Sequence, residues 1–194
     1  MWRLSALLWV MGLLIATRSS PPFAQVLQPA VSTPVVILLR HAEKAAEPED
    51  DPPLTSAGAK RAQDLAVLLQ NARVSGIITT QFLRTKETAQ PLAAARGIAP
   101  EAIQIKLPVS VSNLAAHVAA VTAAVQHHAD GVVVVIGHDI TLPAIVGALG
   151  GPRLPDICES RFGNLFVILP SPINAPLVHM HYGDKDPEPG PNCI

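Results

Sequence analysis

Five consecutive apolar, β-branched residues, Val132–Ile136, stand between Gly131 and Gly137. A short apolar run bounded by glycines is typical of a strand that is buried on both faces. Val35–Leu39 is a second apolar run of the same kind. Strands buried on both faces occur in parallel sheets that helices cover, so these two runs favour an α/β fold.

Segments with helical periodicity alternate with the apolar runs along the chain. Four helices are predicted. The first starts after Thr55, and the second covers Leu83–Ala95. The third has Leu114, Val118, Val121 and Val125 on one apolar face, and the fourth extends from Thr141 to about Gly150. The further predicted strands are Ile77–Thr80, Ile103–Leu107, Leu165–Leu169 and Leu177–Tyr182. This alternation predicts three α/β/α layers around a mostly parallel central sheet.

Length and composition limit the classes of protein that this chain can represent. Its 194 residues suit one compact domain, and 49% apolar with 15% charged residues argues against general disorder. The formal net charge is −1, the basic residues are scattered, and aromatic residues make up only 4%. A nucleic-acid-binding surface is therefore not expected.

The first residues form a sequence of a different kind. A positive start at Arg3 precedes the short apolar run Leu4–Ala16, which is too short for a typical membrane span. We interpret residues 1–24 as a signal peptide, 25–34 as a linker, 35–183 as the folded domain and 184–194 as a Pro-rich tail. The expected location is periplasmic or secreted with no membrane span after cleavage, and an uncleaved anchor is the alternative.

The chain has two cysteines, Cys158 and Cys193. In an exported protein they can form one disulfide, although their spacing does not decide whether they do. Neither has a neighbouring base that would activate it, so a thiol nucleophile is not expected.

Charged and imidazole side chains follow three of the predicted strands. Arg40 and His41 follow the first, Arg84 lies four residues beyond the second, and His138-Asp139 follows Val132–Ile136 after one glycine. In sheets of this type ligands lie beyond the carboxyl ends of the strands. Two guanidinium groups and two imidazoles at this edge predict an anion site, and phosphate is the anion that such groups fit.

The residue types suggest a different chemical role for each group at this site. One histidine, kept neutral by the nearby arginines, can attack phosphorus through its lone pair. The second histidine can hydrogen-bond to the phosphate oxygens and stabilise their charge in the transition state. A carboxylic acid must protonate the departing oxygen and later help water to attack the phosphohistidine.

The pentapeptide Arg40–Lys44 resembles the opening motif of the histidine phosphatase superfamily, which is also called phosphoglycerate mutase-like. The resemblance continues in the expected order to about Leu149. It includes Leu54-Thr55 with Gly58 and Arg61-Ala62, then Thr80–Thr85 with Thr88-Ala89, and finally Gly137-His138-Asp139.

The resemblance implies a role for each of these residues. His41 would be the nucleophile of a metal-independent phosphomonoester hydrolase without a cofactor, and Arg40, Arg84 and His138 would hold the phosphate. Glu43 is a further candidate for substrate binding. The proton donor is left open between Asp139, which we prefer because the acid-phosphatase branch has an aspartate there, Glu101 and Glu43.

Other hypotheses are compatible with the same residues. His41, Glu43, His138 and Asp139 could bind the metal of a metallohydrolase, or the pocket could bind phosphate without turnover. His179 and His181 share one strand face, which suggests a metal pair, but no third ligand is evident. Little sequence separates Gly97 from the next helix, so we expect a small cap and an open site for a phosphorylated small molecule or envelope substrate. The sequence fixes neither the substrate nor the oligomeric state.

Overall fold

The computed structural model describes residues 33–194. The predicted signal peptide, residues 1–24, and almost all of the predicted linker lie outside the described residues. Within residues 33–194, no helix has both the length and the apolar character needed to cross a membrane.

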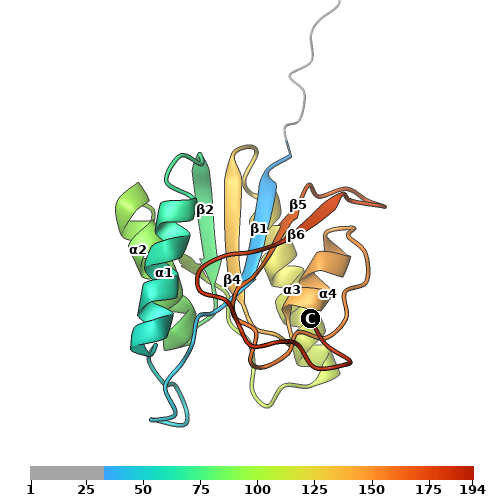
Figure 1. The fold of residues 1–194 in the computed structure, drawn as a ribbon. Helices are drawn as coiled ribbons and strands as arrows, with labels where there is room; N and C mark the ends of the chain where they lie inside the picture. Colours follow the sequence, from blue (N-terminus) through green and yellow to red (C-terminus); the bar gives the residue numbers. More distant parts are fainter. Residues whose placement is uncertain (1–32) are drawn as a thin grey trace, which may run out of the picture. The chain divides into compact units, whose positions relative to one another are not determined.

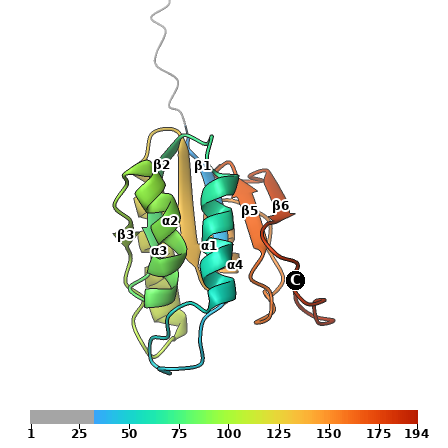
Figure 2. The same cartoon turned by 60° about the vertical axis from the view of Figure 1, so that its left-hand side comes forward.

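Residues 33–194 contain a six-stranded sheet in the order β3-β2-β4-β1-β5-β6. Figures 1 and 2 show this sheet at the centre of the domain. Neighbouring strands are parallel from β3 to β1, whereas β1–β5 and β5–β6 are antiparallel. The prediction of a mostly parallel sheet is therefore confirmed. The strands are β1 (Val35–Arg40), β2 (Val74–Thr79), β3 (Glu101–Ala102), β4 (Val132–Gly137), β5 (Asn164–Ile168) and β6 (Leu177–His181).

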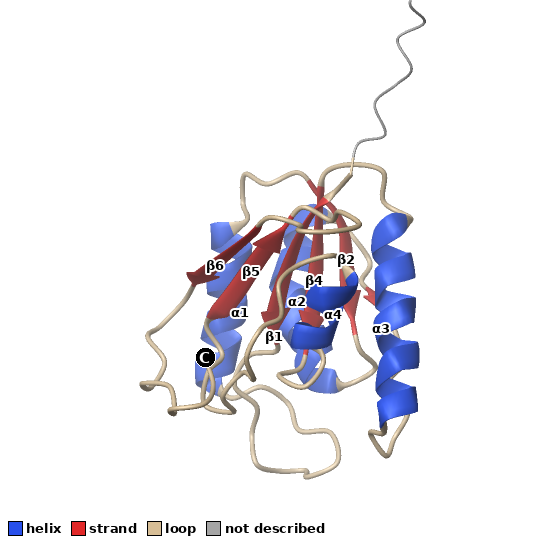
Figure 3. Cartoon of the chain, turned by 90° about the vertical axis from the view of Figure 1, so that its right-hand side faces the viewer, coloured by secondary structure: helices blue, strands red, loops and turns tan. Residues whose placement is uncertain are grey.

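The helices of residues 33–194 cover both faces of the sheet, as Figure 3 shows. They are α1 (Ser56–Leu68), α2 (Leu83–Arg96), α3 (Val111–Gln126) and α4 (Leu142–Ala148). Alternate residues of the buried strands face opposite layers: Val36 and Leu38 pack in the core with α3 and α4, and Ile37 and Leu39 pack in the core with α1 and α2. This double burial explains why the runs of β1 and β4 are continuously apolar.

Local sequence accounts for several helix ends. The side chain of Thr55 caps α1 by accepting a hydrogen bond from the backbone N–H of Gly58. A side chain at Gly58 would collide with the carbonyl oxygen of Glu43, because a Cβ there would lie 2.2 Å from it. Gly97 ends α2 in the left-handed conformation, with φ of 64°, where glycine carries no steric penalty.

The predicted strand Ile103–Leu107 is wrong, because β3 contains only Glu101 and Ala102. After Ile103 the backbone leaves the sheet, and the side-chain amide of Gln81 takes the place of a strand partner. Gln81 accepts from the N–H of Ile105 at 3.0 Å and donates to its carbonyl oxygen at 2.8 Å. The apolar character of Ile105 reflects its burial, with 4% of its surface exposed, rather than strand pairing.

The C-terminal segment 184–194 is fastened to the domain. Cys193 forms a disulfide with Cys158, and Ile194 exchanges backbone hydrogen bonds with Asp156 and Cys158. Farther upstream, the side chain of Asp186 is buried. The end of the chain thus supports the loop that precedes β5.

Candidate active site

The register of β1 and β4 brings the two histidines together. Arg40 pairs with Gly137, so His41 and His138 each follow at the same edge of the sheet. Their ring centroids lie 5.3 Å apart. Arg84, in the first turn of α2, lines the same pocket of about 190 Å³ together with Arg40 and Asp139. The convergence of Arg40, His41, Arg84 and His138 expected from the sequence is present in the structure.

The ring of His41 is oriented by a backbone hydrogen bond. Its Nδ1 lies 2.8 Å from the carbonyl oxygen of Ala42, which can only accept a hydrogen bond, so Nδ1 carries the proton. The other nitrogen, Nε2, is therefore left with its lone pair. Burial lowers the pKa of His41 to about 3, the Ala42 hydrogen bond opposes this shift, and the charges of Arg40 and Arg84 reinforce it. His41 is thus a neutral imidazole at physiological pH.

His138 is held by residues from two other segments. Its Nε2 lies 3.1 Å from the hydroxyl oxygen of Thr80, at the end of β2, and its backbone N–H donates to the hydroxyl of Thr141 at 3.0 Å. Burial, followed by the neighbouring His41 and Arg84, lowers the pKa of His138 to about 2. A neutral, fixed imidazole of this kind can donate one hydrogen bond to a ligand oxygen.

Both guanidinium groups combine protein contacts with unused donors. Arg40 Nη1 donates to the carbonyl oxygens of Cys158, at 3.2 Å, and Glu159, at 2.5 Å. The guanidinium carbon of Arg84 lies 4.3 Å from the ring centroid of Phe82. The buried Nε atoms of Arg40 and Arg84 have no hydrogen-bond partner among residues 33–194. Buried donors without partners are costly, so a bound anion would offset part of that cost.

The three candidate proton donors have different positions. Asp139 lines the pocket, and its Oδ2 lies 3.3 Å from Nη2 of Arg40. Glu101 is exposed in β3 and is not among the residues that line the pocket. Glu43 is also outside that lining. Of the three, Asp139 alone lines the pocket.

Glu43 belongs to an ion-pair network with Arg61 and Asp186. Its carboxylate accepts hydrogen bonds from Nε and Nη2 of Arg61, the shortest at 2.7 Å. Arg61 Nη2 also donates to Asp186 at 3.0 Å and its Nη1 to the carbonyl oxygen of Tyr182. Glu43 therefore holds the buried Arg61, and this pairing provides no contact with a phosphate in the pocket.

Sequence reasoning missed several residues of the site. Lys44, Phe82 and Glu159 line the pocket, and Phe162 lies under Arg40, with its ring centroid 4.4 Å from the guanidinium carbon. Lys44 and Phe82 neighbour the recognised motifs, so their position in the chain was an available signal. Glu159 and Phe162 come from an irregular segment without periodicity, and no sequence signal pointed to them.

His117, His179 and His181 have hydrogen-bonding partners outside the pocket. His179 Nε2 lies 2.9 Å from the side-chain oxygen of Asn164, and His181 Nε2 lies 2.9 Å from Arg161. Among residues 33–194 no group of three or more His, Cys, Asp or Glu is arranged to hold a metal ion. His117, in α3, is buried with its Nδ1 3.2 Å from the carbonyl oxygen of Gln104.

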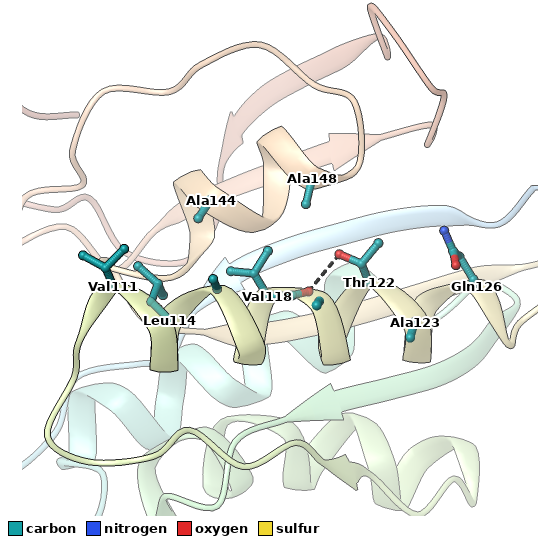
Figure 4. A pocket seen from close by; sticks show the side chains of 10 residues that line it. Val111, Leu114, Val118, Thr122, Ala123, Gln126, Ala144 and Ala148 are labelled. Carbon is teal, nitrogen blue, oxygen red and sulfur yellow. Dashed lines mark hydrogen bonds between the residues drawn. The ribbon is translucent and has the colours of Figure 1, made fainter.

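A larger hollow, of about 610 Å³, lies between α3 and α4, as Figure 4 shows. Its lining is Val111, Leu114, Ala115, Val118, Ala119, Thr122, Ala123, Gln126, Ala144 and Ala148. No ionisable side chain is among them. The lining is largely apolar, and it contains no ionisable residue able to act as an acid or base in phosphate chemistry.

Comparison with known families supports the resemblance of the motifs. Residues 36–106 match the model of the histidine phosphatase superfamily (branch 1). This stretch contains Arg40, His41 and Arg84, and it ends before His138. No curated protein matches the chain in sequence.

Solved structures share the fold at low sequence identity. A candidate alpha-ribazole-5'-P phosphatase from Escherichia coli is 17% identical with a TM-score of 0.61, covering 77% of this chain and 97% of that one. The protein histidine phosphatase SixA, complexed with tungstate, is 18% identical with a TM-score of 0.56, covering 76% and 96%. A mycobacterial glucosyl-3-phosphoglycerate phosphatase is 15% identical with a TM-score of 0.58, covering 74% and 96%. Residues 36–106 thus match the histidine phosphatase superfamily (branch 1), and the described domain shares its fold with these solved phosphatases.

Proposed function

We propose that this protein hydrolyses phosphomonoesters through a phosphohistidine formed on Nε2 of His41. The observation that carries the proposal is the hydrogen bond of 2.8 Å between Nδ1 of His41 and the carbonyl oxygen of Ala42. It leaves Nε2 as a neutral nucleophile in a pocket shared with Arg40, Arg84 and His138.

In the first step, the lone pair of His41 Nε2 forms a bond to phosphorus, and the bond from phosphorus to the ester oxygen breaks. The departing oxygen takes a proton from the carboxyl group of Asp139. Arg40 and Arg84 stabilise the charge on the equatorial oxygens, and His138 donates a hydrogen bond to one of them.

In the second step, the carboxylate of Asp139 accepts a proton from a water molecule. The water oxygen bonds to phosphorus, and the bond from phosphorus to Nε2 breaks. Inorganic phosphate leaves, and His41 returns to the neutral form. Because Asp139 is protonated again, the protein is ready for another cycle.

We also propose that the protein acts outside the cytoplasm, with a mature chain that begins near Gln25. The predicted signal peptide motivates this location. The disulfide between Cys158 and Cys193 supports it, because disulfides persist mainly in oxidising compartments.

Hydrolysis of p-nitrophenyl phosphate in the presence of EDTA tests the activity. We expect turnover by the wild type and a loss of at least a thousandfold in His41→Ala, since the covalent pathway is removed. His127→Ala is the matched control, because His127 is an exposed histidine at the end of α3. Equal rates for wild type and His41→Ala would exclude His41 as the nucleophile, and loss of activity with EDTA would favour a metal-dependent reaction.

A further inference from the structure

One rim of the catalytic pocket is apolar and unusually exposed. Leu107 and Val109, in the segment before α3, are 63% and 44% exposed, and Ile140, after the His138-Asp139 turn, is 53% exposed. All three line the pocket that contains His41. Exposed apolar side chains beside a phosphate site indicate that an apolar part of a ligand or partner covers them during function.

The rim continues into the hollow between α3 and α4. Val111 lies two residues beyond Val109, is 89% exposed and lines that hollow. On the other wall, Ala144 of α4 lies one helical turn beyond Ile140 and also lines it. The segment from Val109 to Val111 and the segment from Ile140 to Ala144 therefore both lead from the catalytic pocket to the same end of the hollow. Figure 4 shows Val111 and Ala144 at that end.

The length of the hollow suits a chain rather than a small group. Its lining residues on α3 extend from Val111 to Gln126. At 1.5 Å of rise per residue, this separation corresponds to about 22 Å along the helix axis. An occupant with its phosphate at His41 could thus extend an apolar chain over the rim and along α3.

The lining also favours an alkyl chain over a peptide. Its only polar side chains, Thr122 and Gln126, lie toward the end away from Val111, and the Thr122 hydroxyl already donates to the carbonyl oxygen of Val118 at 2.9 Å. A peptide in this hollow would bury backbone N–H and C=O groups without partners, which is costly. An alkyl chain has no such groups and gains from burial.

We propose that the apolar strip formed by Leu107, Val109, Val111 and Ile140, together with the hollow, binds the alkyl chain of a lipid phosphate monoester whose phosphate is cleaved at His41. This inference rests on the proposed phosphatase function and specifies its substrate class. The strip determines specificity, and the charged groups of the pocket bind the phosphate common to all monoesters.

A series of n-alkyl phosphates tests the proposal, with methyl, butyl, octyl and dodecyl phosphate below their micelle concentrations and release of inorganic phosphate as the readout. We expect kcat/KM to rise with chain length, by up to about fourfold for each buried methylene. The double variant Leu107→Ser/Ile140→Ser should lower the ratio of dodecyl to methyl kcat/KM at least tenfold. Val67→Ser is the matched control, because Val67 is an exposed residue (61%) of α1 that does not line the pocket, and it should leave the ratio unchanged.

The outcomes separate the two proposals. If wild type hydrolyses methyl and p-nitrophenyl phosphate through His41 but kcat/KM does not change with chain length, the lipid inference is wrong and the phosphatase function stands. A phosphopeptide preferred over dodecyl phosphate would also overturn the inference. If no monoester is hydrolysed, or if His41→Ala keeps the activity, the proposed function itself fails.

Discussion

Nη1 of Arg40 donates a hydrogen bond of 3.2 Å to the carbonyl oxygen of Cys158. Cys158 is one half of the disulfide with Cys193, so the loop that holds Arg40 is fastened to the end of the chain. The disulfide thus stabilises a residue of the phosphate site as well as the fold.

Removing the disulfide should weaken phosphate binding and stability together. In Cys158→Ser/Cys193→Ser we expect KM for p-nitrophenyl phosphate to rise about fivefold, because the hydrogen bonds that orient Arg40 loosen. Since the two cysteines are separated by 35 positions in the sequence, loop closure predicts a loss of about 3–4 kcal/mol in the free energy of unfolding. Enzyme kinetics and urea unfolding measure the two effects.

A reductant provides the control for this experiment. Wild type treated with a phosphine reductant should behave like the double variant, and the double variant should not respond to the reductant. An unchanged KM in both cases would mean that Arg40 keeps its orientation without the disulfide.

Asp139→Asn tests the proton donor. We expect a loss of about a hundredfold or more in kcat/KM for methyl phosphate, whose departing oxygen needs a proton, and a loss below tenfold for p-nitrophenyl phosphate, whose departing oxygen is a weak base. Glu101→Gln should leave both values unchanged. Equal losses on the two substrates for Asp139→Asn would limit Asp139 to orienting Arg40, its neighbour at 3.3 Å.

Acid should destabilise the folded protein through its buried histidines. The pKa values of His41 and His138 fall from 6.5 to about 3 and about 2 on folding. Below pH 6.5 the unfolded chain therefore binds protons that the folded chain does not. The free energy of unfolding should fall by up to roughly 1.4 kcal/mol per pH unit for each histidine as the pH drops from 6.5 toward 3, and it should be fully retained above pH 6.5.

Urea unfolding at several pH values between 7 and 4 measures this slope. The variant His138→Gln should remove about half of the slope that His41 and His138 together produce. His127→Asn, a change at an exposed position, should leave the slope unaltered. A wild-type free energy of unfolding that does not vary from pH 7 to pH 4 would contradict the buried, neutral state of these rings.

The network of Arg61, Glu43 and Asp186 should contribute to stability. Arg61→Leu leaves the carboxylates of Glu43 and the buried Asp186 without their main partner, and we expect a loss of about 3–5 kcal/mol in the free energy of unfolding. The neighbouring Lys60, 56% exposed and paired with Asp64 and Asp184, provides the control. Lys60→Ala should have a far smaller effect, and similar losses for both variants would argue against a special role for the buried network.

Much of the fold and of the phosphate site could be predicted because both depend on local patterns. Continuous apolar runs identified β1 and β4 as buried parallel strands, and parallel strands place the residues after their carboxyl ends at one edge. Arg40, His41 and His138 follow those two strands directly. Their proximity was therefore encoded in the order of the sequence.

The parts that could not be predicted depend on tertiary contacts. Glu43 lies within the recognised motif, but its pairing with Arg61 is visible only in three dimensions. The side chain of Gln81 replaces a strand partner for Ile105, so an apolar segment that looked like a strand leaves the sheet. Glu159 lines the pocket from an irregular loop. Its neighbour Cys158 is bonded to Cys193, so this loop is held by a contact with the end of the chain.

Capture of the phosphoenzyme tests the central claim most directly. Wild type mixed with radiolabelled phosphomonoester and quenched in alkaline denaturant within milliseconds should retain label on the protein, stable to base and released by acid. Peptide mapping should assign this label to His41, and His41→Ala should retain none under the same conditions. Turnover without any labelled protein, or label that persists in His41→Ala, would contradict covalent catalysis by this histidine.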